Sequence, residues 1–74
     1  MTTGKTEDEL LALLYEGFAS ARIVDANVGR IRRKDDDGWD VELRSVSGRR
    51  PSNDELMTFT TIKLRLQREF HLVT

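Results

Sequence analysis

Residues 31–43 have the sequence Ile-Arg-Arg-Lys-Asp-Asp-Asp-Gly-Trp-Asp-Val-Glu-Leu, which predicts a β-hairpin closed by the Asp-Gly turn. Side chains alternate between the two faces of a strand, so Trp39, Val41 and Leu43 share one face. A three-residue loop over 36–38 pairs the first residue of this stretch with the last and completes that apolar face. The ribbon is therefore predicted to turn its indole side toward a core.

The opposite face of the hairpin is charged. The same register places Arg32 opposite Glu42 and Lys34 opposite Asp40. Pairs of opposite charge on facing strands contribute roughly 0.2–1 kcal/mol each. A single register thus gathers the apolar residues on one face and pairs opposite charges on the other. This agreement favours the hairpin.

Helices are expected on both sides of the ribbon. The segments Thr6-Glu-Asp-Glu9 and Ser52-Asn-Asp-Glu55 both have the pattern of a capping box, in which a hydroxyl and a glutamate satisfy the first free amides of a helix. Apolar residues at helical spacing follow each box and predict helices over 6–21 and 52–70. Within the second helix, residues 57–67 also alternate as a strand would, and this reading stays open.

These elements predict an α+β fold in one small domain over 1–74, with a flexible N-terminus at 1–5 and strands at 22–34 and 39–47. Both helices are expected to pack on the face of the sheet that carries Trp39. A two-stranded ribbon is not stable alone, so a third strand around 23–28 or a second chain at the edge is expected to support it.

Composition limits the class of protein. The chain has 74 residues, no cysteine and a net charge of −1, which allows one domain without disulfides. It contains no apolar run of the roughly 18–20 residues that a membrane span needs. The first residues do not resemble a signal peptide, so we expect a cytoplasmic protein that does not associate with membranes.

The sequence does not predict an enzyme. His71 is the single histidine, and no serine stands in a known nucleophile motif. Gly4-Lys5-Thr6 matches only the end of a phosphate-binding loop, and the aspartates at 35–37 lack the ligand spacing of a calcium loop. We therefore expect no catalytic residues, no cofactor and no metal.

The basic residues give one candidate binding site. They cluster on the charged face of the hairpin and in the loop that follows it: Arg30, Arg32, Lys34, Arg44, Arg49 and Arg50. Such a face could contact a phosphate backbone. However, Asp40 and Glu42 lie among these residues, and an isoelectric point near 5.8 is unlike that of most nucleic-acid-binding domains.

The leading hypothesis is a non-catalytic protein-binding module, such as an inhibitor, adaptor or regulator of the kind that phages and other mobile elements encode. A surface carrying both signs of charge favours selective recognition of a protein partner. The first alternative is nucleic-acid binding through the arginine-rich face. The second is a homodimeric structural protein, and the apolar C-terminal residues Phe70, Leu72 and Val73 could either close the core or contact another protein.

Overall fold

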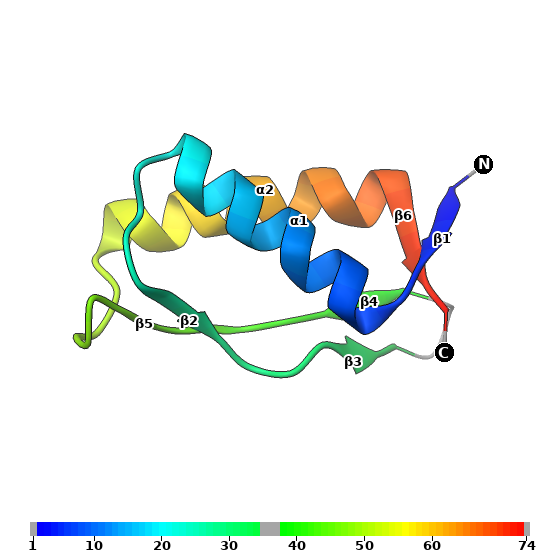
Figure 1. The fold of residues 1–74 in the computed structure, drawn as a ribbon, viewed down its shortest axis with the longest axis horizontal. Helices are drawn as coiled ribbons and strands as arrows, with labels where there is room; N and C mark the ends of the chain where they lie inside the picture. Colours follow the sequence, from blue (N-terminus) through cyan, green and yellow to red (C-terminus); the bar gives the residue numbers. More distant parts are fainter. Residues whose placement is uncertain (1, 35–37, 74) are drawn as a thin grey trace.

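The computed structural model describes residues 2–34 and 38–73, and it has the predicted α+β class. Figure 1 shows two helices on the same side of a long, irregular ribbon. The elements in chain order are β1 (Thr3–Lys5), α1 (Glu7–Ser20), β2 (Ala26–Val28), β3 (Arg32–Arg33), β4 (Trp39–Asp40), β5 (Leu43–Val46), α2 (Asn53–Glu69) and β6 (Phe70–Leu72).

Both helices begin at the predicted capping boxes. The Glu9 amide donates to the Thr6 hydroxyl at 3.2 Å, and the Thr6 amide donates to Glu9 Oε1 at 3.0 Å. Ser52 and Glu55 repeat the pattern at 3.2 and 2.8 Å. Residues 57–67 are helical, so the strand alternative is wrong. The reciprocal bonds fix the first turn of each helix, which explains why the start sites were readable from sequence.

The hairpin forms, but in a different register. Arg32 pairs with Asp40 and Arg33 with Trp39, and the Lys34 amide donates to the Gly38 carbonyl at 2.9 Å. The predicted register, with Arg32 opposite Glu42 and Lys34 opposite Asp40, is therefore wrong, although the side chains of Arg32 and Glu42 still meet across the ribbon. The shift is two residues, which preserves the face of every side chain and leaves Trp39 and Val41 inward.

Farther from the turn, a shift in register divides the ribbon into two parts. Asn27 pairs with Ser45 but Val28 pairs with Leu43, so Arg44 is an extra residue on β5. A bulge of this kind reverses which residues face inward. Val41 lies inward before the bulge and Val46 after it, each 1% exposed, while Leu43 is only partly buried. The predicted strand at 22–34 thus becomes two short strands, β2 and β3. They pair with β5 and β4, so the segment does not add a third strand beside the hairpin.

The additional pairing comes from the two ends of the chain. β1 lies parallel to β6, with Thr3 opposite Phe70 and Lys5 opposite Leu72. The expectation of a flexible segment over 1–5 is therefore wrong for Thr3–Lys5. It missed a pairing between residues almost 70 positions apart, which local sequence patterns do not encode. The predicted helix over 52–70 also ends at Glu69, because Phe70 begins β6.

One buried cluster joins the helices to the ribbon. It contains Leu10, Leu14, Phe18, Ile31, Trp39, Val41, Phe59, Ile62, Leu66 and Leu72. The rings of Phe18 and Phe59 stack at 5.9 Å between α1 and α2. A Cβ on Gly17 would lie 2.8 Å from Ile62 Cγ2, so a glycine is what lets the two helices approach this closely.

Candidate functional site

The ribbon gathers three of the predicted basic residues around one hollow. Arg30, Arg32 and Arg44 line a depression of about 420 Å³ together with Glu42, Gly29 and Ile31. A Cβ on Gly29 would lie 3.0 Å from Arg44 Nε, so the Arg44 side chain crosses directly over this glycine. The hollow therefore combines guanidinium groups with a carboxylate and is open to solvent.

Two of these arginines already have acidic partners within the chain. Arg32 Nη2 lies 3.2 Å from Glu42 Oε1, and Arg30 Nη2 lies 3.6 Å from Glu7 Oε1. The carboxylates offset much of the local positive charge that a phosphate would need. All four side chains are solvent-accessible, so these ion pairs contribute little to stability.

Arg49 and Arg50 lie elsewhere, between β5 and the start of α2. Arg49 Nη1 and Nη2 donate to the two carboxylate oxygens of Glu55 at 2.8 and 2.9 Å. This two-point contact, followed by the bond from the Ser52 amide, lowers the pKa of Glu55 to about 2. Arg49 thus reinforces the cap of α2, and the structure separates it from the hollow lined by Arg30 and Arg44.

Asp40, which the sequence predicted to face Lys34, instead contacts Lys63. Lys63 Nζ of α2 lies 3.0 Å from Asp40 Oδ1. The Lys63 contact is the main reason that the pKa of Asp40 lies below its ordinary value, with a bond from the Val41 amide assisting. Asp40 therefore ties the ribbon to α2, and Lys34 is an exposed residue outside the hollow.

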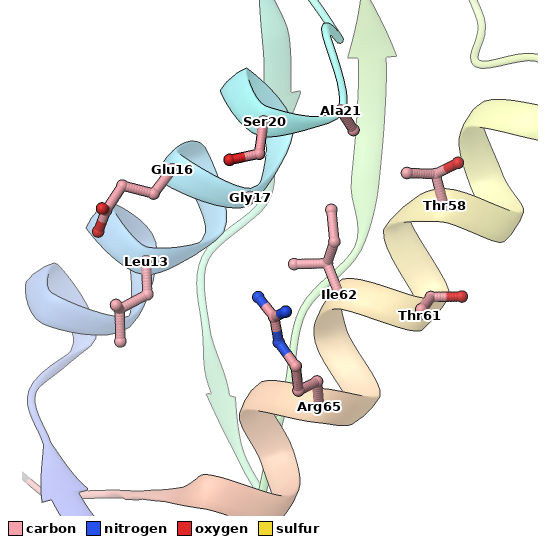
Figure 2. A pocket seen from close by; sticks show the side chains of 9 residues that line it. All are labelled: Leu13, Glu16, Gly17, Ser20, Ala21, Thr58, Thr61, Ile62 and Arg65. Carbon is pink, nitrogen blue, oxygen red and sulfur yellow. The ribbon is translucent and has the colours of Figure 1, made fainter.

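A second surface, which the sequence did not predict, is a groove between α1 and α2 (Figure 2). Its volume is about 540 Å³, and its lining comes from both helices: Leu13, Glu16, Gly17, Ser20, Ala21, Thr58, Thr61, Ile62 and Arg65. Figure 2 shows Ile62 and Arg65 of α2 extending toward α1. Gly17 and Ala21 leave room there, because neither has a bulky side chain.

The groove has the composition of a docking surface. Apolar atoms of Gly17, Ala21 and Ile62 alternate with three hydroxyl groups, while Glu16 on α1 and Arg65 on α2 supply opposite charges. The only sequence signal was Gly17, whose position inside a predicted helix marks a close approach of another element. Its partner across the groove could not be read from local spacing.

Other classes of site have little support in the described part of the chain. Residues 2–34 and 38–73 contain no cluster of three or more acidic, histidine or cysteine side chains placed to bind a metal. The aspartates at 35–37, weighed above as a calcium loop, lie outside the described residues. His71 Nδ1 lies 2.7 Å from the Thr2 hydroxyl, which links β6 to the N-terminal residues.

Within residues 2–34 and 38–73, neither α1 nor α2 combines the length and the apolar character that crossing a bilayer requires. Comparison of the chain with protein-family models, curated proteins and solved structures finds no significant match.

Proposed function

We propose that this chain is a non-catalytic protein-binding module that receives its partner in the groove between α1 and α2. The observation that supports this proposal is the groove itself: about 540 Å³, open to solvent, with apolar surface between polar and charged groups. Interfaces between proteins combine an apolar centre with a polar rim in this way. Adaptors and inhibitors act through such surfaces without reacting groups.

The expected partner element is an amphipathic helix or an extended loop. Gly17 and Ala21 offer little side-chain bulk, so an apolar side chain of the partner can reach the backbone of α1. Glu16 and Arg65 would then pair with charges of opposite sign on that element, which fixes its direction along the groove. Recognition of this type places an apolar helix face in a groove between helices.

Affinity capture with matched tryptophan variants tests the proposal. Ala21→Trp fills the groove, whereas Ala19→Trp places the same side chain on an exposed position of α1 that does not line it. We expect the wild-type chain and Ala19→Trp to capture one protein in stoichiometric amounts, and Ala21→Trp to lose it. Capture of nothing by the wild type, or of the same protein by all three, would contradict the proposal.

Nucleic-acid binding is the second candidate, because three arginines converge on one hollow of the ribbon. It is disfavoured by the acidic partners of Arg30 and Arg32. A titration with duplex DNA and RNA at two salt concentrations separates the candidates. Steep salt-dependent binding that is lost in Arg30→Glu and Arg44→Glu would support this second function. Absence of binding at low salt would remove it.

A further inference from the structure

The outward face of α2 carries an apolar stripe that the core does not use. Met57 is 69% exposed and Leu64 is 50% exposed, and Leu56 lies at the edge of the stripe. Met57 and Leu64 are seven residues apart, so they lie two turns apart on the same side of the helix. The buried residues Phe59, Ile62 and Leu66 occupy the opposite side.

Two threonines fill the space between these apolar side chains. The Thr60 hydroxyl donates to the Leu56 carbonyl at 2.9 Å, and the Thr61 hydroxyl donates to the Met57 carbonyl at 3.0 Å. Their hydrogen-bonding groups are therefore satisfied within the helix. Covering this stripe would leave no donor unpaired, and the small side chains permit close approach of another helix.

The charges beside the stripe are self-complementary. Asp54, Thr61 and Arg68 are spaced by seven residues, so they share one side of α2, with Thr61 at the midpoint. A two-fold axis through Thr61 exchanges the two ends of this row. An antiparallel second copy of α2 would therefore bring each Asp54 next to the Arg68 of the other chain. The opposed helix dipoles would add to this attraction.

We propose that a second copy of this chain docks on the Met57–Leu64 stripe, with the two α2 helices antiparallel about an axis near Thr61. This contact differs from the strand-edge dimer expected from the sequence. This contact borders the proposed groove at Thr61, which also lines the groove. Its charge test is separate from the groove function, because Asp54 and Arg68 do not line the groove. One pair of short helices buries less area than a standard stable interface, so the dimer forms at high protein concentration.

Exchange of the two charges tests this pairing. Asp54→Arg and Arg68→Asp each bring like charges together in a homodimer, so each variant should dimerise at least tenfold more weakly than the wild type. In an equimolar mixture, every charge again meets its opposite, and the heterodimer should form with restored affinity. Sedimentation velocity over a concentration series follows the shift from 8.5 kDa toward twice that mass.

Asp8→Arg is the matched control. Asp8 and Asp54 both occupy the second position of a capped helix, so both substitutions have the same effect on charge and on the helix dipole. Dimerisation of Asp8→Arg should equal that of the wild type, and far-UV circular dichroism verifies that all variants are folded. A wild type that sediments as one chain at every concentration would overturn the proposal. An equimolar mixture of Asp54→Arg and Arg68→Asp that dimerises no more tightly than either variant alone would also overturn it.

Cross-linking provides a second measurement that does not depend on charge. The natural chain has no cysteine, so Thr61→Cys introduces one thiol near the proposed axis. With oxidised glutathione as the oxidant, two such chains should form a disulfide much faster than Ala12→Cys chains, whose thiol is exposed on α1. Equal rates for both variants would contradict the geometry.

Discussion

The indole Nε1 of Trp39 donates a hydrogen bond to the backbone carbonyl of Phe70 at 3.1 Å. Trp39 stands at the start of β4, and Phe70 is the residue at which α2 gives way to β6. The carbonyl of Trp39 also accepts a hydrogen bond from Gln67 of α2. A single buried residue thus joins the ribbon to the end of the second helix, and both layers depend on it.

Trp39→Phe should destabilise the fold. The substitution leaves an apolar ring but removes the Nε1–H group, so the Phe70 carbonyl loses its donor and a small void forms. We expect a loss of about 2 kcal/mol in the free energy of unfolding, which corresponds to a fall of roughly 8–16 °C in Tm. Denaturant unfolding gives the value, and a change below a few tenths of a kcal/mol would contradict the described contact.

Gly17→Ala should also destabilise, although alanine is the better helix former. The added Cβ would lie 2.8 Å from Ile62 Cγ2, and Ile62 is branched at Cβ and cannot easily move away. Overpacking of roughly 1–3 kcal/mol exceeds the gain of about 1 kcal/mol in helix propensity. Thermal unfolding checks the sign. A higher Tm for Gly17→Ala would show that the helices do not approach at this residue.

Arg22→Gly should stabilise the protein. Arg22 has a φ of 60° directly after α1, a left-handed conformation that favours glycine. The Arg22 amide bonds to the Ala19 carbonyl and the Ile23 amide to the Phe18 carbonyl, which is the pattern of a Schellman motif. We expect a gain of roughly 0.5–1 kcal/mol, measured by denaturant unfolding. Arg65→Gly, in the interior of α2, is the control and should lower stability.

Stability should depend on Glu55 in acid. The Arg49 contact lowers the pKa of Glu55 from 4.5 to about 2, so the folded state favours the ionised carboxylate. This contribution is complete above pH 4.5 and is lost as the pH falls toward 2. Glu55→Gln should therefore have a lower Tm than the wild type at neutral pH, and the difference should shrink over that interval.

Arg49→Ala provides the control for this pH dependence. Without the guanidinium, the pKa of Glu55 should rise toward its ordinary value, so the loss of stability in acid should be smaller and should be complete at a higher pH than in the wild type. Melting curves recorded from pH 7 downward follow both variants. Parallel Tm curves for wild type and Glu55→Gln would contradict the assigned contact.

The local features of the fold were predictable because local bonds fix them. Thr6 with Glu9 and Ser52 with Glu55 mark the helix starts, since each bond spans only three residues. Trp39 was placed inward by alternation alone. The two-residue shift in register was not predictable, because side-chain alternation is unchanged by a shift of two.

The features that depend on distant residues were missed. The parallel pairing of β1 with β6 needs Thr3 and Phe70 together, and the bulge at Arg44 leaves no local signal. The candidate site was predicted in part: Arg30, Arg32 and Arg44 converge, but Arg49 is held by Glu55. The groove between the helices requires knowing that Gly17 faces Ile62, which only the packed structure provides.

The measurement that tests protein recognition most directly is a residue-resolved titration of the ¹⁵N-labelled chain with its captured partner. The account predicts that the largest amide shifts map to Gly17, Ala21 and Arg65, around the groove. The amides of Arg30 and Arg44 on the ribbon should change little. Largest shifts at Arg30 and Arg44, with the groove unaffected, would contradict it.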